Sequence, residues 1–257
     1  MDHAIAGAVL VGWPVHDAVL MWPPLIRAYE DGDEEEMNKA RFRAYLMSIG
    51  MPWATLAGLA YAVHKGVLNR SDLLLNTKVL PDPVSWRTLL PLGVCVLGSL
   101  DTATPLVLSL AKEGPTPGSE NVEEVAFKAY FPSTPEQLVG WAGVSVTAGI
   151  SEEVLFRGFL PFYLRKHLAL SPAASYGVST ALFGAVHLYA RESSDASFAS
   201  NWKGALGSAA IGGIFSWVAY ETNSILVPIV CHAFIDMCAG AFAFNVRRKA
   251  ERKYEQI

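Results

Sequence analysis

Apolar residues along this chain gather into seven long runs that are separated by more polar stretches. The runs cover residues 4–26, 44–64, 88–111, 137–164, 168–190, 204–220 and 224–245. A helix needs about 20 mostly apolar residues to cross the hydrocarbon core of a bilayer, and most of these runs reach that length. The pattern therefore predicts an all-α fold, a polytopic membrane helical bundle of about seven transmembrane helices.

The first run, residues 4–26, is the least regular of the seven, because Pro14, His16 and Asp17 interrupt it. Two placements stay open for it: a transmembrane helix, or a helix that lies in the membrane interface. A cleaved signal peptide is the less favoured interpretation, since no Lys or Arg precedes the apolar stretch. With or without this span, we expect most of the chain to be embedded in the bilayer.

The distribution of Lys and Arg between the runs predicts the orientation, because cytoplasmic loops and tails carry an excess of these residues. The loops after the first, third and fifth runs, together with the tail 246–257, hold about twice as many Lys and Arg as the other loops. The count predicts a cytoplasmic C-terminus. Since no organelle address is recognisable, we expect an integral protein of the plasma membrane.

Composition agrees with a membrane setting and argues against other classes. Hydrophobic residues make up 52% of the chain and charged residues 17%, whereas charge is about 25% in a typical soluble domain. The net charge of -4 comes with no basic stripe, so no nucleic-acid partner is expected. Cys95, Cys231 and Cys238 all lie in apolar runs without zinc-site spacing, which favours buried free thiols over a disulfide.

An acidic run and four tryptophans mark the ends of expected helices. The acidic run 31–36 is typical of a solvated loop or a helix start rather than of a calcium site, because the spacing of a calcium-binding loop is missing. Trp22, Trp86, Trp141 and Trp202 lie near the ends of apolar runs, where interfacial tryptophans gather.

Ionisable side chains interrupt three of the later runs, although each costs roughly 2.5 to 3.5 kcal/mol to place at the centre of a bilayer. They belong to three motifs, Glu152-Glu153-x3-Arg157, Phe183-x3-His187 and His232-x3-Asp236. Charged residues persist in such surroundings mainly where they pair, line a wet cavity or do chemistry. The motifs together predict one polar intramembrane cavity.

In the first motif, Glu153 and Arg157 lie four residues apart with the acid N-terminal, the favourable spacing for an ion pair within one helix. Glu152 is turned about 100° away from Glu153, which makes it the candidate for a reactive carboxylate. An alternative interpretation is that all three side chains form a structural ion network between two helices. Pro161 lacks a backbone donor and predicts a kink just beyond the motif.

The second and third motifs each place two side chains on one helix face, one turn apart. Taken alone, His187 is typical of an ordinary histidine at a helix end. His232 and Asp236 are typical of an imidazole that is oriented by an acid. Together with Glu152, the two histidines are the groups needed to activate a water molecule and to stabilise an oxyanion.

In these residues the chain resembles the CAAX protease and bacteriocin-processing family of intramembrane proteases, also called the CPBP or ABI family. The family pattern is EExxxR, then FxxxH, then HxxxN or HxxxD on successive membrane helices, and all three motifs occur here in that order. The resemblance covers about residues 137–245, which we expect to form the catalytic core. Residues 1–136 are then N-terminal membrane helices and loops, and residues 246–257 a basic cytoplasmic tail.

The resemblance implies an intramembrane endopeptidase that acts on a peptide or membrane-protein substrate in the lipid bilayer. In this family, Glu152 and His187 would polarise the attacking water. His232 and Asp236 would stabilise the developing oxyanion. These four residues are the expected catalytic set.

Glu153, Arg157 and Phe183 are then expected to support the site structurally. No cofactor is expected: two histidines and several acids could bind zinc, but the family pattern implies glutamate-dependent chemistry and no HExxH motif is present. The family pattern allows Asn or Asp at the position of Asp236. An Asn could donate a hydrogen bond to an oxyanion, whereas an ionised Asp can only accept one. Asp236 is therefore protonated, orients His232, or favours a metal.

Two functions without catalysis stay open as alternatives. The first is a membrane scaffold or immunity protein that keeps the same fold and binds another membrane protein. The second is a small transporter that uses the intramembrane acids. The transporter is less favoured, because the chain lacks paired Gly- or Pro-broken segments in two related halves.

Overall fold

The computed structural model describes residues 21–76, 85–104, 129–189 and 202–254, together with the single positions 3, 7 and 107. Within these residues the chain is helical and contains no β-strand, which confirms the all-α prediction. The α-helices are α3 (Trp22–Glu30), α4 (Glu34–His64), α5 (Trp86–Asp101), α8 (Pro135–Glu153), α9 (Leu160–Leu168), α10 (Pro172–Val186), α11 (Trp202–Thr222) and α12 (Leu226–Tyr254). A π-helical segment, η4 (Val154–Phe159), joins α8 to α9, and short 3-10 turns occupy Arg70–Leu73 and His187–Tyr189.

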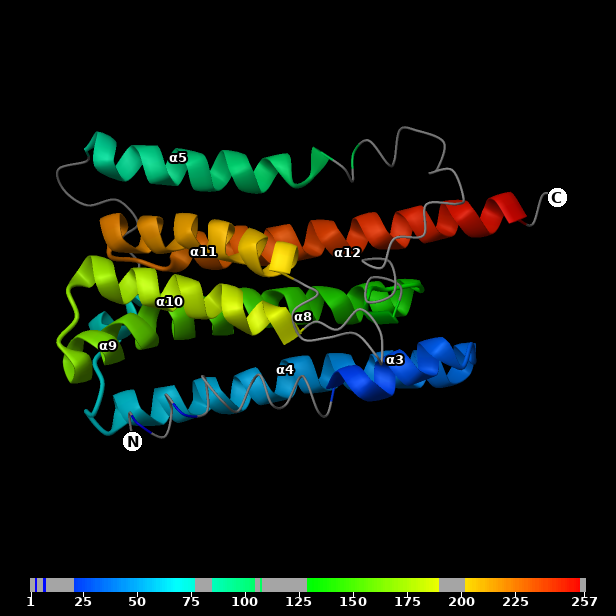
Figure 1. The fold of residues 1–257 in the computed structure, drawn as a ribbon, viewed down its shortest axis with the longest axis horizontal. Coiled ribbons are helices and arrows are strands. Elements are labelled where there is room, and N and C mark those ends of the chain that lie inside the picture. Colours follow the sequence, from blue (N-terminus) through cyan, green and yellow to red (C-terminus); the bar gives the residue numbers. More distant parts are fainter. Residues whose placement is uncertain are drawn as a thin grey trace.

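The helices share nearly one axial direction and are stacked side by side (Figure 1). α5 lies at one edge of the stack and α4 with α3 at the opposite edge. Between them, α8 packs against both α12 and α4, while α10 packs mainly against α11. The helix that carries the first motif, α8, therefore lies in the middle of the bundle.

The described parts of the apolar runs from residue 44 onward fall mainly on these helices. Residues 4–20 of the first run, apart from position 7, lie outside the described residues, as do positions 105, 106 and 108–111 of the third run and position 190 of the fifth. Two helices extend beyond their runs. α4 begins already at Glu34, because the Asp33 side chain accepts from the backbone N–H groups of Glu35 and Glu36 and caps the helix. The acidic run is thus a helix start. α12 continues through the basic segment to Tyr254.

Two described helices are long and apolar enough to cross a membrane: Glu34–His64, and the part of α12 from Leu226 to Lys249. Length and composition alone identify them, so the prediction of about seven spans is not confirmed. Large apolar side chains on the outer helix α5, such as Trp86 and Leu97, are exposed. A lipid environment would cover such a surface.

Arg41 joins the start of α4 to the segment that leads into α8. Its side chain is fully buried, although the sequence pattern treats it as a loop cation. Nε donates to the backbone oxygen of Ala129 at 2.9 Å, and Nη1 donates to Ser133 Oγ and Gln137 Oε1, both at 2.9 Å, and to Asn38 Oδ1 at 3.1 Å. Because buried polar groups are costly unless they are bonded, this network fixes α4 beside α8.

Glycine allows α8 and α12 to approach closely at Gly149. A Cβ atom added there would lie 2.9 Å from both the backbone nitrogen of Ala233 and the backbone oxygen of Ile229. Both contacts are with the α12 backbone, which cannot move aside as a flexible side chain could. The close approach brings the end of α8 against the helix that carries the third motif.

We expect Gly149→Ala to lower the free energy of unfolding by about 1 to 3 kcal/mol, because the added methyl group overpacks the contact between α8 and α12. Gly93→Ala in α5 is the matched control, since a Cβ atom there meets nothing within 4 Å. The control should be neutral or stabilising by up to about 1 kcal/mol, because Ala favours helices over Gly. Thermal unfolding of the detergent-solubilised variants measures both effects, and equal midpoints for the two would contradict the expectation.

Candidate active site

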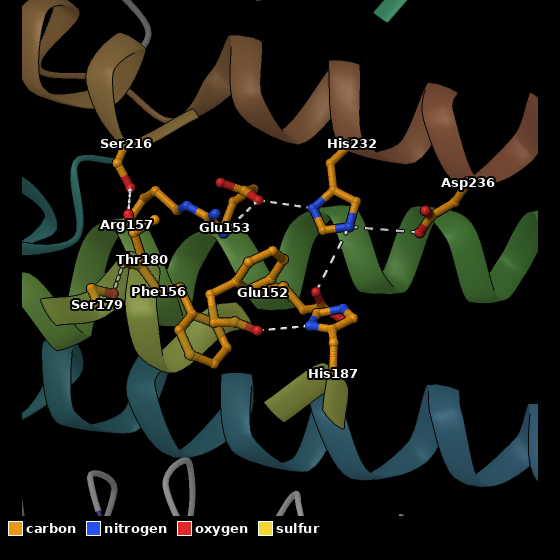
Figure 2. Close-up of polar contacts among 11 residues, drawn as sticks. Glu152, Glu153, Phe156, Arg157, Ser179, Thr180, His187, Ser216, His232 and Asp236 are labelled. Atoms are coloured by element: carbon orange, nitrogen blue, oxygen red, sulfur yellow. Dashed lines mark hydrogen bonds and ion pairs between the residues drawn. The ribbon is translucent and has the colours of Figure 1, made fainter. Parts of the chain in front are cut away.

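The three sequence motifs meet in one place in the bundle (Figure 2). Glu152 and Glu153 end α8, and Arg157 follows in η4. The second motif ends α10, where His187 is the C-cap residue, and the third lies in α12. The seven motif residues thus come from α8 with η4, from α10 and from α12.

Glu153 is the centre of the buried part of the site. Its Oε1 atom accepts from Arg157 Nη1 at 2.9 Å, as the four-residue spacing predicts, and contacts His232 Nδ1 at 2.8 Å. The side chains of Glu153 and Arg157 are fully buried, with exposed fractions of 0%. Because a carboxylate oxygen can only accept, His232 carries a hydrogen on Nδ1, and Glu153 fixes both the tautomer and the direction of the ring.

Arg157 is enclosed by aromatic rings and a glycine. Its Cζ atom lies 4.2 Å from the centroid of the Phe183 ring and 5.7 Å from that of Phe215, distances that allow cation–π attraction. A Cβ atom at Gly212 of α11 would lie 2.5 Å from Arg157 Nη2. Phe183 therefore covers a buried cation, and its structural support of the site stays a prediction.

The second ring nitrogen of His232 faces two carboxylates. Nε2 lies 3.7 Å from Glu152 Oε2 and 3.6 Å from Asp236 Oδ2, which are ion-pair distances rather than hydrogen bonds. The side chains of Glu152 and Asp236 are 22% and 31% exposed, in contrast to the sealed Glu153. The Nε2 side of His232 therefore faces the two partly exposed carboxylates of the site.

His187 is oriented by its own helix. Its Nδ1 atom lies 2.7 Å from the backbone oxygen of Phe183, so Nδ1 carries the hydrogen and the neutral ring keeps its lone pair on Nε2. In Figure 2, the carboxylate end of Glu152 points toward both the His187 ring and the His232 ring. The partly exposed Glu152 side chain thus faces two imidazoles whose orientations are fixed by different partners.

Some residues of the site carry no recognisable signal in the sequence. Trp141 lies near the end of an apolar run, but it is buried rather than interfacial, and its Nε1 donates to the backbone oxygen of Asp236 at 2.7 Å. The exposed Trp86 and Trp202 fit the interfacial prediction better. Phe215 of α11 packs against His232, with ring centroids 5.7 Å apart, and only the fold brings it there.

The expected polar cavity is not confirmed. A cavity of about 430 Å³ lies between α4, the 3-10 turn at Arg70–Leu73 and α8, and it contains no motif residue. Its lining is mostly apolar, with Leu56, Leu59, Ala60, Val63, His64, Arg70, Leu73, Leu75, Ile150 and Val154. Among the described side chains, no group of three or more His, Cys, Asp or Glu is placed to hold a metal ion.

A comparison with known protein families places this site in a wider context. Residues 132–238 match the family model described as Type II CAAX prenyl endopeptidase Rce1-like. This segment is similar to the Rce1-like family. It contains all three motifs, from Glu152 to Asp236, and confirms the resemblance to the CAAX protease family. No curated protein and no solved structure matches the chain.

The Rce1-like match supports a protease-like enzyme embedded in a membrane. The matched residues begin just before α8 and end within α12, so they include every helix that contributes a motif. α3, α4 and α5 lie outside the match.

Proposed function

We propose that this chain is an intramembrane endopeptidase that hydrolyses a peptide bond with a water molecule activated by Glu152 and His187. One observation carries the proposal: of two adjacent carboxylates, Glu153 is sealed and paired, whereas Glu152 is 22% exposed and faces two imidazoles. A general base must reach the proton that it removes. Of these two carboxylates, Glu152 is the one that meets the requirement.

In the proposed first step, Glu152 takes a proton from water while His187 Nε2 accepts the second hydrogen bond of the same molecule. The Nδ1–H···O=C bond to Phe183 supports this role, because it leaves the lone pair of the neutral ring on Nε2. The activated water attacks the carbonyl carbon of the substrate. Glu152 then returns the proton to the leaving amine, as a general base that becomes a general acid.

His232 is the proposed oxyanion donor. With Nδ1 bonded to Glu153, a protonated His232 directs its second N–H toward the side of the partly exposed Glu152. Arg157 donates to the same Glu153 oxygen and holds the carboxylate in place, and so strengthens that orientation. A donor held in place before the reaction stabilises the developing charge without reorganisation.

Asp236 is the proposed electrostatic partner of His232. Because Glu153 occupies Nδ1, Asp236 is left with the Nε2 side, at 3.6 Å. A negative charge at this distance favours the protonated imidazole that an oxyanion requires. This geometry favours a role for Asp236 in stabilising the charged His232 ring over direct hydrogen bonding from Asp236 to the oxyanion.

The proposed substrate is a peptide or a membrane protein that approaches within or from the bilayer, with no nucleic acid involved. The proposed chemistry uses no resident metal ion, since water activation is assigned to Glu152 and His187. We further propose a plasma-membrane location with the C-terminus in the cytoplasm, where the basic end of α12 would lie near anionic lipid headgroups.

Comparison of membrane peptidomes tests the proposal. We expect cells that carry the wild-type chain to contain cleavage fragments that are missing with Glu152→Ala and with His187→Ala, at equal amounts of protein in the membrane. Normal processing by both variants would show that the chain is not this peptidase. An unchanged peptidome together with an unchanged cellular phenotype would favour the scaffold alternative.

A further inference from the structure

The π-helical segment η4 creates a backbone acceptor that its own helix cannot satisfy. In η4 the hydrogen bonds span five residues, and the N–H of Leu160 donates to the backbone oxygen of Leu155. The next pair in this register would join residue 161 to the oxygen of Phe156. Residue 161 is Pro and has no N–H. The backbone oxygen of Phe156 therefore receives no hydrogen bond from the π-helical pattern of its own segment.

Ser179 of α10 supplies the missing donor. Its hydroxyl group donates to the backbone oxygen of Phe156, and Ser179 itself is fully buried (Figure 2). A buried carbonyl without a partner is costly, so this bond stabilises the widened turn. The bond also connects two helices that both carry motif residues.

The position of Ser179 on α10 links the turn to the reacting groups. Ser179, Phe183 and His187 follow at four-residue intervals and share one face of the helix. Phe183 covers Arg157 of η4, and its backbone oxygen orients His187. The hydrogen bond of Ser179 to Phe156 therefore fixes the position of the C-terminal end of α10, where His187 lies, relative to the end of α8.

We propose that Ser179 is a positioning residue for the reaction. By capping the carbonyl group that Pro161 leaves without a donor, Ser179 holds η4 in its π register and α10 at the distance that brings His187 to Glu152. The inference rests on the proposed peptidase function for its catalytic consequence. Its structural part, the fixing of η4, stands on the hydrogen bond alone.

Two variants and one control separate this role from a general loss of packing. Ser179→Ala removes the donor, and Ser179→Ala combined with Pro161→Ala gives residue 161 an N–H that can donate to Phe156. Ser175→Ala is the matched control, because Ser175 is also buried on α10, one turn earlier, and its hydroxyl bonds only within the helix, to the backbone oxygen of Pro172.

The readouts are amide hydrogen exchange of the peptide 154–161 and the steady-state kinetics of cleavage in the purified full-length protein. For Ser179→Ala we expect exchange to rise by about tenfold. We also expect kcat to fall by about tenfold with KM unchanged, because misplaced catalytic groups slow the chemical step rather than binding. Ser175→Ala should leave both unchanged, and the double variant should recover most of both.

Equal exchange in the Ser179→Ala and Ser175→Ala proteins would overturn the inference, as would a double variant that folds but recovers nothing. Faster exchange with an unchanged kcat would overturn the positioning role. A wild-type protein that cleaves no substrate, but shows the expected exchange pattern, would overturn the peptidase proposal and support the Ser179 hydrogen bond.

Discussion

Glu152→Gln should lower the kcat of peptide cleavage by about 100- to 10,000-fold, the usual contribution of a general base. The amide keeps the size of the side chain but cannot take a proton from water. Since the amide is nearly isosteric with the carboxylate, and Glu152 lies 3.7 Å from His232 Nε2, beyond hydrogen-bond distance, we expect the thermal midpoint to change little. Steady-state cleavage of a fluorogenic membrane peptide, with thermal unfolding of the same sample, measures both quantities.

Glu136→Gln is the control for this experiment, because Glu136 is an exposed acid in the first turn of the same helix. Its activity should equal that of the wild-type protein. A Glu152→Gln protein with more than about a tenth of wild-type kcat would remove Glu152 from the role of general base. The reaction would then need a different base.

Arg157→Met should lower the free energy of unfolding by roughly 3 to 5 kcal/mol, the usual cost of leaving one partner of a buried ion pair without the other. Glu153 and Arg157 are both fully buried, so neither can regain water when its partner is lost. The loss of Arg157 also removes the cation that packs on Phe183 at 4.2 Å. Chemical denaturation in detergent micelles measures the change.

The double replacement of Glu153→Gln and Arg157→Met tests whether the loss comes from the uncompensated charge. It should be more stable than Arg157→Met alone, because no buried carboxylate then lacks its cation. If the two proteins unfold at the same denaturant concentration, packing rather than charge explains the effect. The double variant should have low activity, because His232 loses its charged partner at Nδ1.

Much of the fold can be predicted from the sequence, because helix positions depend on residues that are close together in the chain. Apolar runs of helical length predict the positions of the helices, and the spacing of Glu153 and Arg157 predicts their bond because residues four apart share a helix face. The ends of α4 and α12 were harder to predict, since a cap at Asp33 and a basic last segment extend helices beyond their apolar residues.

Contacts between distant residues could not be predicted in the same way. His232 and Glu153 are 79 residues apart, so only the packing of α12 on α8 brings them together. The π register of η4 left no trace in the apolar pattern, because residues 137–164 form one continuous run. Pro161 marked the place as irregular, but the widened turn depends on a donor from another helix, Ser179.

The pairing of Glu153 with Arg157 also bears on how this chain enters a membrane during synthesis. Both charges belong to one continuous helical segment and bond to each other without help from any other helix. They can therefore reach the lipid as a neutral pair before α12 has been made, at a lower transfer cost than two separate charges. His232 belongs to α12, the last helix to be made, and it then bonds to a Glu153 side chain that Arg157 already orients.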